Sequence, residues 1–127
     1  MGYLFKKHYT RDEARGLLPR IRQWFSRLSR TRERLDQLDQ RLAGLLSSGN
    51  DAGGPFVNQW VTALADLKEI LGEFRRREIQ IKDFDRGLID FPAIRGGREV
   101  FLCWEQDEED IEFWHDLNSN YAGRERL

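Results

Sequence analysis

The sequence predicts an α+β protein, in which a long antiparallel, coiled-coil-like hairpin of two helices adjoins a small antiparallel β-sheet. Three observations predict this class. Apolar residues recur in heptads through the first two thirds of the chain, a Gly/Ser-rich loop at 47–55 interrupts them, and the pattern changes to period two after Lys82. We expect a single domain over 1–127, since 127 residues is a usual length for one domain. Its expected parts are a hairpin at 10–81, a sheet from 3–9 and 88–115, and a polar tail at 116–127.

The N-terminal segment is expected to form a strand at 3–9, because Tyr3, Phe5 and Tyr9 are evenly spaced. The first helix begins after it, where Thr10 and Glu13 match a capping box. It continues to about residue 47, and Pro19 predicts a kink or a break at 15–18, since proline lacks an amide hydrogen. One face of this helix is apolar, with heptad rows that include Ala14, Ile21, Leu28, Leu35, Leu42 and Leu17, Trp24, Leu38, Leu45.

The second helix is expected at 56–81. It carries two apolar rows at heptad spacing, formed by Val57, Leu64, Leu71 and by Trp60, Leu67, Phe74, Ile81. A two-helix hairpin alone buries one stripe per helix. It therefore needs the rest of the chain or a second copy to complete its core. Because the apolar stripe is longer than a small sheet can cover, we expect a second copy to cover it, which makes the protein a homodimer.

The sheet is expected from the last third of the chain. Residues 88–91 and 99–104 read as two strands joined by a hairpin turn at Arg95-Gly96-Gly97-Arg98. An acidic loop is expected at 105–110. Residues 111–115 then form a third strand, which completes a meander.

The net charge of −1 results from cancellation. Residues 1–50 carry +6, residues 51–82 carry zero and residues 83–127 carry −7. Arg20, Arg27, Arg34 and Arg41 lie seven residues apart with no acid at helical pairing distance. They are a solvated flank of the core, partners for acids of this chain or another subunit, or phosphate contacts. The acidic third would repel a polyanion, so nucleic acid is disfavoured as a partner.

Cysteine usage and hydropathy limit the compartment. Cys103 is the only cysteine, which predicts that the chain has no intrachain disulfide and no cysteine-based zinc site. The longest apolar run, Val100–Trp104, is far too short to span a membrane, and the N-terminus lacks the pattern of a signal peptide. We expect a cytoplasmic protein without a transmembrane segment.

Four stretches together resemble one protein family. They are Tyr9–Ala14 with Leu17–Pro19, Lys82–Asp83 with Gly87–Pro92, Leu102–Trp104 with Glu108, Ile111, Trp114 and His115, and lastly Gly123–Arg124. The pattern is similar to the bacterial and archaeal proteins grouped as domain of unknown function 2203. This chain departs from it at Asp107, where the family tends to have glycine, and at Arg126, where it tends to have proline. The resemblance covers nearly the whole chain and supports the fold, but it implies no activity.

A cluster of acids and one histidine is the best candidate for a site. Asp90, Glu108 and His115 are candidates for general acid and base, and Asp85, Asp90, Glu108 and His115 are candidate ligands of a divalent metal, with Asp83 nearby. Asp83–Gly87 does not match a calcium loop. The structural alternative is a buried hydrogen bond between Asp90 and His115 that holds the sheet edge.

Three further residues are candidates for binding. Trp104 and Trp114 either pack the sheet against the helices or line a pocket floored by Asp90 and His115. Arg124 is expected to reach back to Asp90 or Glu108.

Two hypotheses of function follow. The first is a self-associating helical hairpin, a homodimer that acts in protein interaction. The alternative is a small metal-dependent enzyme of the hydrolase kind.

Overall fold

The computed structural model describes residues 2–49 and 53–127 and confirms the α+β class. Two helices, α1 (Arg11–Ser47) and α2 (Gly53–Arg76), precede a sheet, so the predicted first helix and its end are confirmed. Part of the predicted interhelical loop, 50–52, lies outside the described residues. The chain forms two compact units. One contains residues up to 22 together with 73–127, and the other contains residues 23–72.

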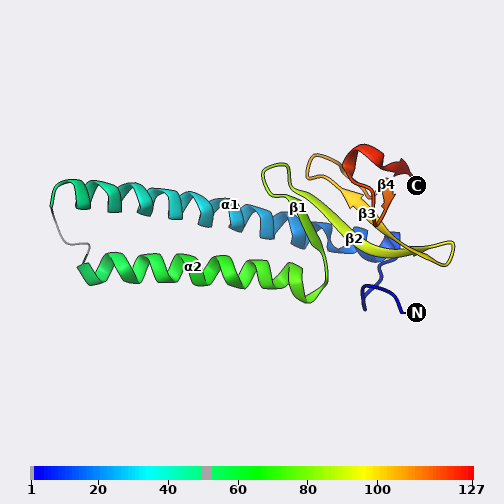
Figure 1. Cartoon of the computed structure of the whole chain (residues 1–127), viewed down its shortest axis with the longest axis horizontal. Coiled ribbons are helices and arrows are strands. Elements are labelled where there is room, and N and C mark those ends of the chain that lie inside the picture. Colours follow the sequence, from blue (N-terminus) through cyan, green and yellow to red (C-terminus); the bar gives the residue numbers. More distant parts are fainter. Residues whose placement is uncertain (1, 50–52) are drawn as a thin grey trace. The chain divides into compact units, whose positions relative to one another are not determined.

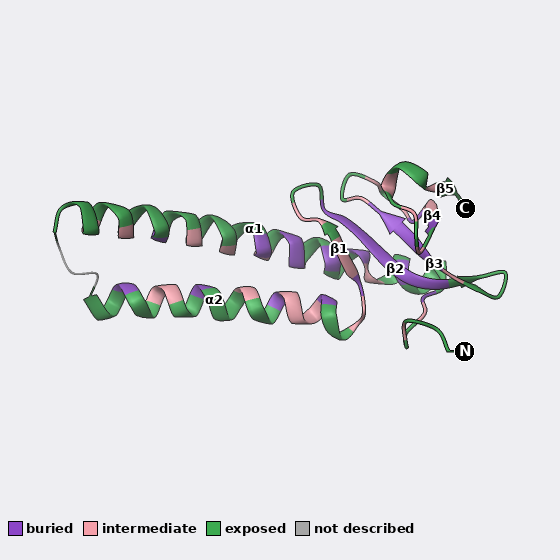
Figure 2. Cartoon of the chain, in the orientation of Figure 1, coloured by how far each residue is buried: buried purple, intermediate pink, exposed green. Residues whose placement is uncertain are grey.

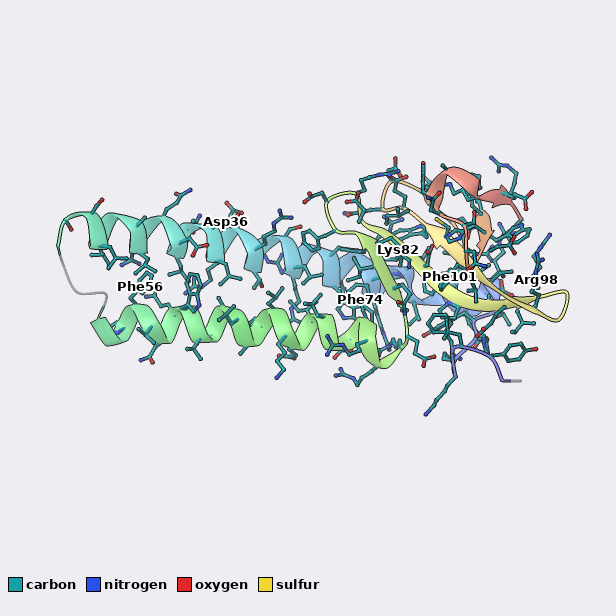
Figure 3. All side chains as sticks on the ribbon, in the orientation of Figure 1. Asp36, Phe56, Phe74, Lys82, Arg98 and Phe101 are labelled. Atoms are coloured by element: carbon teal, nitrogen blue, oxygen red, sulfur yellow. The ribbon has the colours of Figure 1, made fainter. Side chains whose placement is uncertain are left out.

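The second unit is an antiparallel pair of helices that lie side by side (Figure 1). Its core forms around Leu38, Phe56 and Ala63. Phe56 points into the space between the helices (Figure 3), where leucines of α1 and Trp60 pack around it. Apolar residues of the two helices therefore pack against each other in this unit.

The sheet has five antiparallel strands in sequence order: β1 (Gln80–Asp83), β2 (Leu88–Arg95), β3 (Arg98–Trp104), β4 (Phe113–Asp116) and β5 (Glu125–Arg126). The predicted turn joins β2 to β3, and both of its glycines have positive φ, 60° at Gly96 and 76° at Gly97. Two positive-φ residues are what a tight hairpin with the strands' natural twist requires.

The predicted strand at 3–9 does not form. Two carboxylates hold this segment instead: Glu99 accepts from the amides of residues 4 and 5, and Glu78 accepts from those of residues 6 and 7. One ladder-like bond remains, from the Tyr9 amide to the Pro92 carbonyl at 2.7 Å. The segment's donors are therefore satisfied mainly by side chains of distant elements, which the alternation of its own residues does not reveal.

Of the kink or break predicted near Pro19, the break is absent, because α1 runs continuously through this residue. Pro19 removes one helical hydrogen bond, while the neighbouring Leu18 and Ile21 are buried. Packing of the apolar face holds the helix across the missing bond.

The predicted second helix is too long at its C-terminal end. α2 ends at Arg76, and Glu78 has a φ of 58°, the left-handed conformation that often follows a helix. The Ile79 amide caps the helix through the Phe74 carbonyl at 3.0 Å. Residues 80–83 become β1, because pairing with β2 outweighs the helical periodicity.

The predicted polar tail also has structure. Residues 121–123 form a short 3₁₀ helix, η1 (Tyr121–Gly123). Strand β5 pairs with β4, with Phe113 opposite Arg126 and Trp114 opposite Glu125. Two residues of strand are too few to leave a pattern in sequence.

The two faces of the sheet differ. Residues directly opposite in antiparallel strands share a face, so the register groups Ile89 with Trp104 and Leu102 with Trp114. Arg22 of α1 lies with its guanidinium carbon 5.0 Å from the Trp104 ring centroid, so the start of α1 covers this face. Figure 2 shows the central strands buried (purple). The other face carries Asp90 opposite Cys103, and it holds the candidate site.

No helix in the described ranges is long and apolar enough to cross a membrane.

Replacing Gly87 with alanine is expected to destabilise the protein by about 2 kcal/mol or more. Gly87 has a φ of 62°, and an added Cβ would lie 2.5 Å from Cβ of Gln106. Gly16→Ala is the matched control, since nothing lies within 4 Å of its added Cβ and alanine favours a helix. Urea unfolding curves would measure both variants, and a Gly87→Ala protein as stable as wild type would contradict the prediction.

Candidate functional site

Three buried side chains, Asp90, Cys103 and His115, meet on one face of the sheet. A carboxylate oxygen, the thiol sulfur and an imidazole nitrogen all lie within 4.8 Å of one another. The three residues are 1%, 1% and 2% exposed. Charged and polar groups are rarely buried this deeply unless they are paired or bind a metal.

The strand register brings these residues together. Asp90 of β2 lies directly opposite Cys103 of β3, and His115 of β4 lies opposite Phe101. Cys103 and Phe101 are two residues apart on one strand, so all four side chains share a face.

His115 uses both ring nitrogens. Nε2 lies 3.0 Å from each carboxylate oxygen of Asp90, and Nδ1 lies 2.8 Å from the backbone carbonyl of Asp116. Burial acts to lower the pKa of His115, but the Asp90 carboxylate and the Asp116 carbonyl outweigh it and raise that pKa above its ordinary value. The buried hydrogen bond of the structural alternative therefore exists, with a proton between the two side chains.

Cys103 is kept as a thiol. Burial, together with the nearby Asp90 carboxylate, raises the pKa of Cys103 to about 12, although Arg124 acts against this rise. A nucleophilic cysteine needs a lowered pKa, so this environment does not suit covalent catalysis.

A cavity of about 490 Å³ opens next to the cluster. Strand residues form one wall and the segment before β5 forms the other. Its lining consists of Lys82, Asp83, Leu88, Asp90, Cys103, His115 and residues 119–122. A volume of this size suits a small-molecule ligand.

Glu108 does not join Asp90 and His115. Its carboxylate pairs with the Arg124 guanidinium at 3.0 Å and accepts from the Glu105 amide at 2.8 Å. Arg124 in turn lies 4.0 Å from the Cys103 sulfur, and it stacks on the rings of Phe113 and Tyr121 at 3.9 and 4.0 Å. The predicted reach of Arg124 back to Glu108 is confirmed, and Glu108 positions Arg124 beside the cluster.

Asp85 and the two tryptophans lie away from the cluster. Asp85 is exposed in the turn between β1 and β2, whereas Asp83, which accepts from the Arg86 amide at 3.2 Å, lines the cavity. Trp104 is buried on the opposite face and donates to the Glu108 carbonyl at 2.9 Å. Trp114 lies on the same face as Trp104 but is only half-buried, with the Arg95 guanidinium carbon 4.8 Å from its ring centroid. Neither tryptophan lines the cavity beside Asp90 and His115.

The four arginines that the sequence analysis singled out are not the ones that contact the acidic loop at 105–110. No ion pair involves Arg20, Arg27, Arg34 or Arg41 among residues 2–49 and 53–127, and Arg41 lies 5.9 Å from the Phe56 ring centroid. Three other arginines of α1, namely Arg11, Arg15 and Arg22, contact the acidic loop instead. Asp110 pairs with Arg15 at 2.8 Å and Arg11 at 3.6 Å, and Arg22 donates to two carbonyls of the acidic loop.

Cys103 is the site residue that sequence reasoning missed. With one cysteine in the chain, the sequence predicts no cysteine-based zinc site, so Cys103 is absent from the predicted ligands. The turn contained the missing signal, because counting back from Arg95 and forward from Arg98 by equal steps sets Cys103 opposite Asp90.

Two of the four motif stretches, at 82–92 and 102–115, contribute residues to the lining of this cavity. Residues 7–127 match the profile of a family described as an uncharacterized conserved protein, domain of unknown function 2203. The chain belongs to this family. No curated protein and no solved structure matches it. The motif residues Lys82, Asp83, Asp90, Cys103 and His115 all line the cavity of this family member.

The stability of the metal-free protein is expected to fall as the pH rises above about 6.5, the ordinary pKa of histidine. Because the folded-state pKa of His115 is raised, its contribution is complete below the unfolded-state pKa and is lost as the pH passes the folded-state value. Urea unfolding in a chelator at stepped pH would measure this loss. His115→Gln and Asp90→Asn should remove the dependence, while His8→Gln, which changes the other histidine, should retain it.

Proposed function

We propose that Asp90, Cys103 and His115 hold a divalent transition metal of the zinc class, and that the protein is a small metal-dependent enzyme of the hydrolase kind. The observation that carries this proposal is a buried carboxylate, thiol and imidazole within one ligand sphere at the wall of a cavity. Imidazole with thiolate and carboxylate is a donor set typical of zinc.

The hydrogen bonds around the cluster fit this role. A metal-binding histidine usually donates its second ring N–H to a carbonyl or carboxylate, and Nδ1 of His115 faces the Asp116 carbonyl. Nε2 then directs its lone pair toward Asp90 and Cys103. To bind a metal, His115 and Cys103 would give up the proton shared with Asp90 and the thiol proton, so binding would release protons.

Three protein ligands leave a fourth position for water or substrate, which separates catalytic zinc sites from structural ones. The cavity gives a small molecule access to that position. Bound zinc lowers the pKa of a coordinated water to about 7, which makes water a usable nucleophile for hydrolysis. The ligand set is Asp90, Cys103 and His115, with Glu108 outside it.

The proposed ligand role of Cys103 requires a reduced thiol. A reducing compartment maintains one, so we propose a cytoplasmic location.

The purified chain is expected to bind one equivalent of Zn²⁺ by isothermal titration calorimetry, with proton release that varies with the ionisation enthalpy of the buffer. Cys103→Ser and His115→Gln should weaken binding by more than about 100-fold, beyond the loss usual for a supporting residue. His8→Gln is the matched control and should bind as wild type does.

A second readout avoids variants that fail to fold. Co²⁺ added to the wild-type protein should produce the near-ultraviolet absorption of a thiolate–cobalt bond, and Zn²⁺ should protect Cys103 from alkylation in mild denaturant. If Zn²⁺ neither binds nor protects the thiol, the metal proposal is wrong and the Asp90–His115 pair is structural.

A second candidate function, self-association through the hairpin, rests on an exposed apolar row. Val57, Val61 and Leu64 lie one or two turns apart on α2 and are 51%, 57% and 43% exposed. They adjoin the half-buried Trp60 and Leu67, so the apolar face of α2 is wider than one partner helix covers.

We propose that a second copy of the hairpin covers this row. A two-fold contact places the same row on both partners, so an aliphatic strip meets its own match. Residues 53–72 of α2 contain two acids and one lysine. The electrostatic repulsion between two copies at this row is therefore small.

Light scattering at tens of micromolar is expected to show a dimer. Replacing Val57, Val61 and Leu64 together with glutamine should give a monomer of unchanged helicity. Thr62→Gln with Asp66→Asn, at exposed positions on the side of α2 away from the row, should remain dimeric. A wild-type monomer at that concentration would refute this proposal.

A further inference from the structure

Lys82 reaches the cavity because of an irregularity in the sheet. Ile81 pairs with Ile89 and Asp83 with Leu88, so Lys82 is the extra residue of a β-bulge. Bulges redirect side chains and are frequent beside active sites. Lys82 and Asp83 consequently both line the cavity, although neighbouring residues of a regular strand point to opposite faces.

The ammonium group of Lys82 is positioned without a carboxylate partner in the described ranges. Its Nζ lies 5.2 Å from the centroid of the Phe101 ring, and Figure 3 shows the two residues together over the sheet. Three arginines of this unit differ in having carboxylate partners: Arg86 pairs with Glu105, Arg98 with Asp116 and Arg124 with Glu108. Lys82 therefore offers an unpaired positive charge at the wall that contains the metal cluster.

The remaining charges of the cavity leave this one available. With the proposed divalent ion bound, the carboxylate of Asp90 and the thiolate form of Cys103 would balance its charge. The carboxylate of Asp83 already accepts a hydrogen bond from the Arg86 amide, at 3.2 Å, in the β1–β2 turn. The facing wall, residues 119–122, contributes hydroxyl and amide groups and no acid.

We propose that the cavity takes a small molecule with an acidic oxyanion group, a carboxylate or a phosphate, which pairs with Lys82 while the reacting bond lies at the Asp90–Cys103–His115 cluster. This inference rests on the proposed metal site and adds the chemical class of its substrate.

Hydroxamic acids of equal length provide the test, because a hydroxamate binds zinc and the far end of the molecule can be varied. The probes end in a carboxylate, a phosphonate, a carboxamide or an ammonium group, and each is titrated calorimetrically into the zinc-loaded full chain. An anionic end should bind about fivefold more tightly than the carboxamide, the size of a solvent-accessible ion pair, and the ammonium end most weakly. Whichever of the two acids binds more tightly identifies the oxyanion.

Lys82→Met should remove this ranking and leave carboxamide binding unchanged. Lys68→Met, at an exposed lysine of α2, is the matched control and should retain the ranking. Equal affinity for all four probes, or a preference for anions that survives Lys82→Met, would overturn the inference while leaving the metal site intact. Failure of every hydroxamate to bind the zinc-loaded chain would refute an open zinc position facing the cavity, and the inference with it, whereas failure of the chain to take up Zn²⁺ would refute the metal site itself.

Discussion

The register of the β2–β3 hairpin is the constraint on which the site depends. The glycine turn between Arg95 and Arg98 sets Asp90 opposite Cys103, and β4 then adds His115 opposite Phe101. A slip of one residue would turn every side chain of a strand to the other face. The carboxylate would then lie among the apolar residues under α1, where nothing compensates its charge. The strand register therefore decides where the Asp90 charge is buried, and the cost of burying that charge without a partner disfavours any other register.

The buried carboxylate requires a compensating positive charge at the site. Asp90 has almost no contact with solvent, and a buried charge without a partner is strongly destabilising. A proton shared with His115 compensates it in the metal-free protein, and a divalent ion bound also by Cys103 would compensate it in the metal-bound protein. Arg124, held by Glu108 and two aromatic rings, limits the cost of a negative sulfur.

Local patterns predicted the helices, the hairpin turn and the sheet strands well, since periodicity and turn residues reflect local backbone preferences. The errors share one cause. Glu78 and Glu99 take the amide donors of the N-terminal segment, and pairing with β2 takes residues 80–83 from the helix. In each case a partner distant in sequence outweighed the local preference.

The sequence by itself determined the α+β class, the helical hairpin and two members of the cluster, Asp90 and His115, because these follow from spacing and residue type. Only the tertiary structure decided that Cys103 completes the cluster, that Glu108 supports Arg124, and that Lys82 faces the cavity. Those roles depend on which atoms come within a few ångströms of each other. Strand register, a bulge and the folded C-terminal segment set such distances, and the type of each residue does not encode them.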